Sequence, residues 1–234
     1  SKVTSTFAAY GITGDYDSGA VPGALSRRCG TWIKNDILYF FGGFGRAGSG
    51  SDSRLNAMWG YDFAQNKFAY LAGTQATNDP GTWGTKGTPD VGNVASAREY
   101  VNTCLAPDGL LWLGFGFGYQ SSGTTGQLND LWTFNTDTLE WCWQFGDDGI
   151  NQIPVVPGAL HVGDPTNKPS SVQQGAFWDD GRMWTFGGFS YGIANGSSKR
   201  SGSTWKWDTN TFEWTVEGYT GLLADDGNTD LVKG

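Results

Sequence analysis

One block of sequence recurs three times along this chain at a fixed spacing, and a tryptophan marks its position each time. Trp59, Trp132 and Trp205 are evenly spaced, since 132 − 59 = 73 and 205 − 132 = 73. The phrases around them read MWGYDFAQNKFAY, LWTFNTDTLEWCW and TWKWDTNTFEWTV. Self-similarity at a fixed period indicates one supersecondary unit repeated, with each copy burying its apolar face against the next.

Each repeat is predicted to form four short antiparallel strands. The first strand covers residues 29–34, 100–106 and 173–178, and the second carries an aromatic-glycine phrase, LYFFGGFG, LWLGFGFG or MWTFGGFS. Hairpin-turn dipeptides separate the two, namely Asn35-Asp36, Asp108-Gly109 and Asp180-Gly181. The third and fourth strands of the first repeat read MWGYDF and KFAYL. Aromatic residues make up 15% of the chain and charged residues only 16%, which favours an all-β fold over a helical one.

The whole chain, residues 1–234, is predicted to be one portion of a β-propeller. Its repeats extend over about 27–72, 98–144 and 171–217. Long linkers cover 1–26, 73–97, 145–170 and 218–234, and a Gly/Ser-rich loop joins the second and third strands of each repeat. Because the chain starts without Met and both ends lie in linkers, we expect a processed chain or a piece of a longer repeat protein.

These residues resemble the kelch repeat, which forms one blade of a β-propeller. The resemblance rests on the glycine pairs Gly42-Gly43 and Gly187-Gly188, and on LNDLW at 128–132 followed by FNT at 134–136. In the second repeat Phe115 interrupts the glycine pair. The linker over residues 80–98 resembles a long-linker variety of kelch repeat, like that of the galactose oxidase central domain, found in extracellular multi-repeat proteins. The resemblance implies blade architecture and says little about activity.

Three blades do not close a ring, because propellers typically have about four to eight. An open arc would expose two apolar sheet faces. We therefore expect either further copies of the chain or the missing blades of a longer chain against those faces. A third alternative is that the arcs stack into a larger surface assembly or filament.

The sequence predicts no catalytic residue, no metal site and no cofactor. Galactose oxidase is an enzyme on a propeller of the kelch type, and it holds copper with two His and two Tyr. His161 is the only histidine in this sequence, so the same copper site is not expected here. Paired acidic residues occur at 147–148, 179–180 and 225–226. Such pairs could serve glycoside hydrolysis or bind calcium, but these fall on a predicted turn and on linkers, where rigid positioning is not expected.

Two cysteines and three tryptophans are the other candidate site residues. Cys29 and Cys104 lie in the first strands of adjacent repeats, so one prediction is a disulfide between them, and the alternative is two small buried apolar residues. The tryptophans at repeat-equivalent positions are expected in the core. Trp32, Trp83 and Trp178 do not recur in this way, and they are the candidates for stacking on a ligand such as a sugar.

Asn195-Gly196-Ser197 is an acceptor sequence for N-glycosylation in the loop of the third repeat. The net charge of −8 would repel nucleic-acid phosphates and anionic lipid. No apolar run approaches the roughly 18 residues that span a membrane. Nucleic-acid binding and membrane insertion are therefore not expected.

Together these features predict a non-catalytic binding or structural module, extracellular or at the cell surface, that contacts glycan or protein partners through polar loops. Two alternatives stay open. One is a fragment of a kelch-propeller enzyme, an oxidase or a carbohydrate-active enzyme, with its active-site residues outside this chain. The other is an intracellular kelch adaptor, whose blades are usually shorter than these and are joined by shorter linkers.

Overall fold

The computed structural model describes residues 6–156, 159–180, 182–192 and 198–218. Every regular element in these ranges is a β-strand, and no helix occurs among them. No helix of the described chain is therefore long and apolar enough to cross a membrane. The prediction of an all-β chain is confirmed.

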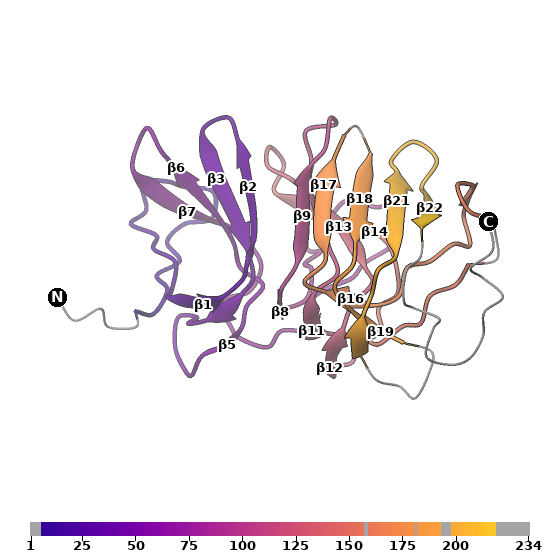
Figure 1. Cartoon of the computed structure of the whole chain (residues 1–234). Coiled ribbons are helices and arrows are strands. Elements are labelled where there is room, and N and C mark those ends of the chain that lie inside the picture. The colour runs from indigo at the N-terminus through magenta and orange to yellow at the C-terminus, as the bar shows by residue number, and fades with distance from the viewer. Residues whose placement is uncertain (1–5, 157–158, 181, 193–197, 219–234) are drawn as a thin grey trace.

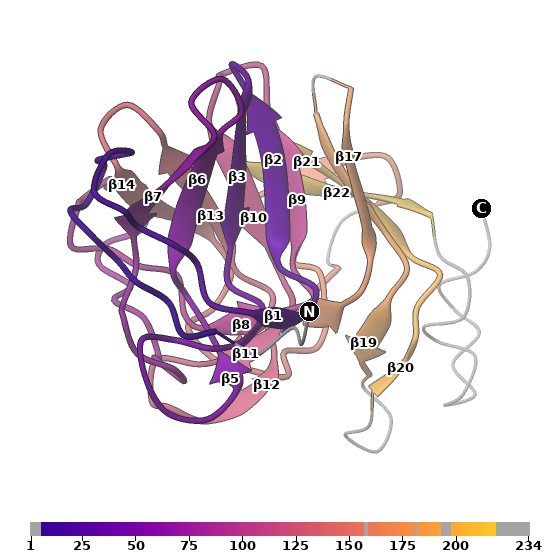
Figure 2. The same cartoon turned by 90° about the vertical axis from the view of Figure 1, so that its left-hand side faces the viewer.

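Three antiparallel sheets form the blades and stack against one another (Figures 1 and 2). Blade 1 consists of β2 (Gly30–Lys34), β3 (Ile37–Phe41), β6 (Met58–Asp62) and β7 (Lys67–Ala72). Blade 2 consists of β9 (Asn102–Leu105), β10 (Leu111–Gly114), β13 (Leu131–Asn135) and β14 (Glu140–Phe145). Blade 3 consists of β17 (Ala176–Asp179), β18 (Met183–Phe186), β21 (Thr204–Asp208) and β22 (Glu213–Gly218).

The third blade departs from the expected four strands, because a linker strand extends it. β15 (Gly163–Asp164) pairs with β22 at the outer edge and makes this sheet five-stranded. The same contact is weaker in blade 2, where Asp90 forms a single bridge with Trp141. The period of the repeats could not show this strand, since linker pairing depends on where the linker lies in space.

The Gly/Ser-rich segments expected as loops instead take part in three further small sheets at one end of the blades (Figure 1). They consist of β1 (Leu25–Arg27), β4 (Phe44–Gly45) and β5 (Ser53–Arg54); β8 (Arg98–Glu99), β11 (Phe117–Tyr119) and β12 (Thr125–Gln127); and β16 (Val172–Gln173), β19 (Phe189–Tyr191) and β20 (Ser198–Arg200). The glycine pair makes the turn between the two kinds of sheet, and Gly42 and Gly43 have φ of 69° and 92°. These strands are only two or three residues long, so they are too short to show an alternating apolar pattern in the sequence.

The linker before each blade closes the outer edge of that blade. Gly14 N donates to Tyr70 O at 2.8 Å, and its repeat equivalent Gly87 N (87 − 14 = 73) donates to Trp143 O at 2.8 Å. The linker rings Tyr10 and Trp83 pack on Trp59 and Trp132, with ring centroids 5.3 and 5.2 Å apart. Trp59, Trp132 and Trp205 are 4%, 0% and 2% exposed, so their predicted burial at equivalent positions is confirmed.

The same three main-chain hydrogen bonds join each blade to the next. Between blades 1 and 2 they are Gly43 N to Arg98 O (2.8 Å), Arg98 N to Leu55 O (3.1 Å) and Tyr100 N to Arg28 O (3.0 Å). Between blades 2 and 3 they are Gly116 N to Val172 O (2.9 Å), Val172 N to Leu128 O (3.0 Å) and Gln174 N to Tyr100 O (3.4 Å). One junction geometry is therefore used repeatedly along the arc.

Candidate functional site: the open face of blade 3

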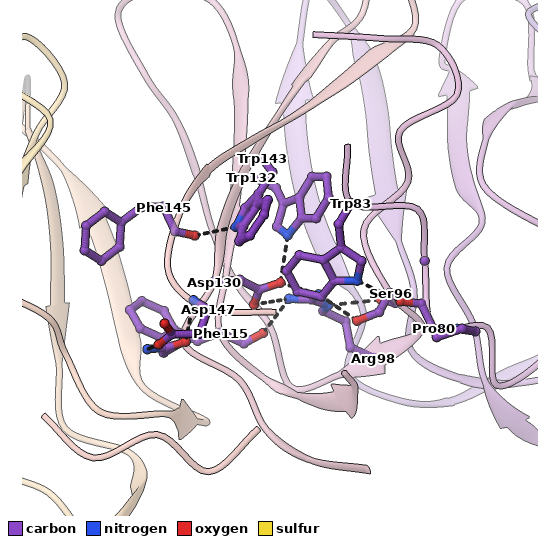
Figure 3. Close-up of polar contacts among 12 residues, drawn as sticks. Pro80, Trp83, Ser96, Arg98, Phe115, Asp130, Trp132, Trp143, Phe145 and Asp147 are labelled. Atoms are coloured by element: carbon purple, nitrogen blue, oxygen red, sulfur yellow. Dashed lines mark hydrogen bonds and ion pairs between the residues drawn. The ribbon is translucent and has the colours of Figure 1, made fainter. Parts of the chain in front are cut away.

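A fully buried ion pair lies beside the core tryptophans at the junction between blades 1 and 2 (Figure 3). Both nitrogens of the Arg98 guanidinium fork bond the Asp130 carboxylate, each at 2.6 Å, and both side chains are 0% exposed. Asp130 Oδ2 also accepts the indole N–H of Trp132 at 2.7 Å, and Ser96 and the Phe115 carbonyl take the remaining Arg98 donors. All polar atoms of this pair are engaged, so the cluster is structural.

A second buried acid ties the small sheets together. Glu99 is 1% exposed and lies between Arg54 at 2.8 Å and Arg27 at 3.2 Å. Arg27 belongs to β1 and Glu99 to β8, so this contact crosses the same junction as the main-chain bonds. Glu99 therefore holds adjacent repeats together.

Two of the three candidate stacking tryptophans belong to the core. Trp32 is 4% exposed, and its indole N–H donates to Cys104 O at 3.0 Å and Trp112 O at 3.1 Å, both in blade 2. Trp83 is 8% exposed, lies against Trp132 and donates to Pro80 O. Neither ring face is available to a ligand, because packing between a blade and its neighbour or linker uses it.

Trp178 differs from both. It pairs with Trp184 across β17 and β18 as Trp32 pairs with Tyr39 across β2 and β3, so Trp178 has the strand position of Trp32. Yet Trp178 is 41% exposed and stacks on Trp184, with centroids 5.9 Å apart and planes 5° apart. No fourth blade follows it within the described chain.

Trp178, Trp184, Phe186 and Phe189 form an exposed aromatic cluster, which we call the open face of blade 3. Phe186 is 47% and Phe189 37% exposed, whereas Phe41, the equivalent of Phe186, is 0% exposed against blade 2. A shallow hollow of about 400 Å³ lies beside them, lined by Gln174, Ala176, Gly188, Arg200 and Ser201 as well as the two Phe rings. Sequence reasoning selected only Trp178 from this cluster. Trp184 and Phe186 align with Tyr39 and Phe41, which are 6% and 0% exposed, so the repeats alone would predict their burial and gave no signal of this cluster.

Charged groups occupy the outer half of the same sheet face. Glu217 forms ion pairs with Lys206 and, from Oε2 to Nδ1 at 2.6 Å, with the exposed His161. Burial disfavours the Glu217 carboxylate, but the hydrogen bonds from Lys206 and His161 outweigh it and lower the pKa of Glu217. The Lys206 ammonium also lies 5.5 Å from the Trp184 ring centroid. The open face is therefore apolar on its inner strands and charged on its outer ones.

The acidic pairs serve local structure where the structure describes them. Asp147 accepts from Lys168 at 2.8 Å and Asn129 at 3.0 Å, and Asp148 accepts from Ser121. Asp180 accepts the indole N–H of Trp184 at 2.7 Å, and Asp179 ends β17. Residues 225–226 and the glycosylation candidate Asn195 lie outside the described residues. Within the described ranges, no group of three or more metal-ligating side chains converges.

Asp147 should make the stability of the protein depend on pH at the acidic end. Partial burial opposes its ionisation, but the hydrogen bonds from Lys168 and Asn129 prevail and lower its pKa below the ordinary 3.8. The stabilisation is fully present above the unfolded-state pKa of about 4 and is lost as pH falls through the lower folded-state value. We expect Asp147→Asn to destabilise at pH 7 and to approach the parent chain at acidic pH. Urea unfolding across pH measures this, and a pH-independent difference would contradict it.

The disulfide predicted between Cys29 and Cys104 does not form. All three cysteines lie in described ranges, and each is a thiol. Strand register gives the reason: Gly30 pairs with Phe41 as Asn102 pairs with Gly114, so the equivalent of Cys29 is Val101 rather than Cys104. Cys104 is three residues further along (104 − 101 = 3), roughly 10 Å, which exceeds the reach of a disulfide of about 7 Å between Cα atoms. The alternative, two small apolar residues, describes them better: Cys104 is buried and Cys29 partly so.

Comparison with known proteins supports the architecture. No family model matches the chain, and no curated protein matches its sequence. The solved structure of YjhT, a kelch-repeat propeller protein, is similar with a TM-score of 0.51 and 15% sequence identity over 84% of this chain. The matched part is 52% of YjhT, so this chain spans about half the length of that protein. The chain is an all-β protein of propeller blades, similar in fold to part of a kelch propeller.

Proposed function

We propose that this chain is a non-catalytic binding or structural module of the kelch-propeller kind, which contacts a protein partner or a glycan surface. The open face of blade 3 is the observation that carries the proposal. It places four aromatic side chains, three of them more than a third exposed, on strands β17, β18 and β19. Exposed clusters of large apolar side chains mark contact surfaces.

The engagement of the acid and base groups also supports this function. His161 is held by Glu217, and Asp147 is held by Lys168 and Asn129. A hydrolase needs an acid and a base fixed on either side of a bound substrate. The contacts of these residues instead fasten the linkers to blades 2 and 3.

We place the module outside the cell or at its surface. Support comes from the long linkers and from polar loops rich in Gly, Ser and Thr, in the manner of long-linker kelch repeats. One observation favours the intracellular adaptor instead: the three cysteines are thiols, whereas disulfides are usual in small extracellular domains. Secretion from eukaryotic cells tests the choice. We expect a glycan at Asn195, detected by intact mass and abolished by Asn195→Gln. A chain that folds only in the cytosol would favour the adaptor.

The non-catalytic function is tested by assaying the purified chain. We expect no oxidation of galactose or related alcohols after saturation with Cu(II), and no hydrolysis of a panel of glycosides. Turnover that His161→Ala or the double variant Asp147→Asn/Asp148→Asn abolishes would contradict the proposal. Such a result would favour the enzyme alternative.

A further inference from the structure

We propose that the open face of blade 3 binds blade 1 of a second copy of this chain, head to tail, so that two copies close a ring of six blades (2 × 3 = 6). The inference rests on the proposed function and names the partner of the open face. It follows from four properties that the two free ends of the arc share with the junctions inside it.

The first property is the pattern of main-chain donors and acceptors. Blade 3 presents Gly188 N, Ser201 O and Gln174 O at the positions of Gly43 N, Leu55 O and Arg28 O, and the described residues provide no hydrogen-bond partner for them. The equivalence holds because Ser201 N donates to Gly188 O as Leu55 N donates to Gly43 O. Blade 3 therefore carries the half of the junction that receives a following blade.

Blade 1 carries the complementary half. Arg27 pairs with Phe44 as Glu99 pairs with Phe117 (117 − 44 = 73), so Arg28 takes the place of Tyr100. A bulge in β1 sets Leu25 and Ser26 opposite Gly45, where blade 2 sets Arg98 opposite Gly118. The β1 strand that holds Ser26 is exposed along its whole length. Docking of a second copy would form Arg28 N to Gln174 O, and Gly188 N and Ser201 O would bond the main chain at Leu25 and Ser26, which follows the pattern of the two internal junctions.

The second property is the size of the facing side chains on the innermost strands. A Cβ added at Gly30 would lie 2.9 Å from Val101 of blade 2, and one at Gly175 would lie 3.1 Å from Asn102, so each internal junction sets a glycine against a larger residue. At the open ends the corresponding residues are Ala176 and Cys29. Two small side chains share the space that one glycine and one larger side chain fill elsewhere, so blade 1 fits blade 3 without a clash.

The third property is the position of the exposed aromatic rings. Trp32 is buried between blades because its indole N–H reaches the carbonyls of Cys104 and Trp112. Trp178 has the same strand position, and the equivalents of those carbonyls in blade 1 are Trp32 O and Tyr39 O. Docking would give Trp178 these acceptors and would cover Phe186 as blade 2 covers Phe41.

The fourth property is the number of blades. One arc of three falls short of the about four to eight blades that close a propeller, and three arcs would exceed them. Two arcs fall within that range. Repeated head-to-tail contacts give a closed ring only when the rotation from one copy to the next returns to the first copy. With a two-fold rotation, two copies close the ring, and each copy then covers both the blade 1 end and the blade 3 end of the other.

The mass in solution is the first test. One chain has a mass of 25.2 kDa, so we expect light scattering at micromolar concentration to give twice that mass. Phe186→Asp should give the single-chain mass. The matched control is Phe212→Asp, which changes an equally exposed ring (50% against 47%) on the turn after β21 and should keep the dimer. A parent chain of single-chain mass, or one that forms open polymers, would overturn the proposal.

A cross-link tests the geometry in a nearly unchanged protein. In Ala176→Cys the new thiol should form a disulfide with Cys29 of the second copy when dissolved oxygen is supplied as the oxidant, giving one covalent dimer band on a non-reducing gel. Adding Cys29→Ser should abolish the band. A ladder of larger products would show an open chain of copies, and a dimer that does not cross-link would show another contact; either result overturns the ring.

The outcome for the ring is separate from the outcome for the proposed function. Catalytic turnover by an intact dimer would reject the non-catalytic module and leave the ring in place. A monomer without turnover would reject the ring and leave the module.

Discussion

Replacing Asp130 by alanine is expected to cost about 3–5 kcal/mol of unfolding free energy, the range for breaking a buried ion pair by removing one partner. The variant would leave the Arg98 guanidinium at 0% exposure without its counter-charge. It would also remove the acceptor of the Trp132 indole N–H. Chemical denaturation at pH 7 measures the loss.

A double variant provides the control for this prediction. Arg98→Met combined with Asp130→Leu removes both charges, and apolar replacement of a buried pair is often neutral. We therefore expect the double variant to be more stable than Asp130→Ala. A loss below about 1 kcal/mol in the single variant, far under the usual range for a broken buried pair, would show that water reaches the junction and that the two blades are less closely packed there.

Trp132→Ala is expected to cost about 3–5 kcal/mol, as for other fully buried aromatic side chains. Trp132 is 0% exposed and packs against Trp83 of the linker and against Trp141 and Trp143 of its own blade. Its loss would open a cavity between blade and linker. Phe63→Ala is the matched control, because Phe63 is 51% exposed beside the turn of blade 1. The control should change stability by less than about 1 kcal/mol.

Trp132→Ala and its control Phe63→Ala should also differ in how they affect the linker before blade 2. Trp132→Ala removes the ring on which Trp83 rests, so limited proteolysis should cut within 73–97 faster than in the parent chain. Equal cutting rates, together with a small loss of stability, would contradict the role assigned to the linker in closing the outer edge of each blade.

Much of the fold could be predicted because its determinants are local. The hairpin between β9 and β10 turns at Asp108-Gly109, and Gly109 has φ of 77°, which few other residues adopt easily. The turns between the third and fourth strands are local as well. The last residues of the third strands, Asp62, Asn135 and Asp208, accept backbone N–H groups two and three residues further on with their side chains.

Other features depend on contacts between distant segments. The small sheets form because the chain after each glycine pair meets a strand that precedes the blade, as β4 meets β1. Their residues carry no periodic apolar signal. The buried pair of Arg98 and Asp130 was also missed, since the two charges lie far apart in the sequence (130 − 98 = 32) and composition alone would place both at the surface.

The sequence by itself determined the repeat, the four strands of each blade and the burial of Trp59, Trp132 and Trp205, because a fixed period places equivalent residues at equivalent strand positions. Only the tertiary structure decided which equivalent residues differ. Trp32 and Trp178 share one strand position, yet one is 4% and the other 41% exposed. The reason is physical: the burial of a sheet face depends on the sheet that covers it, and blade 3 has no covering blade among the described residues.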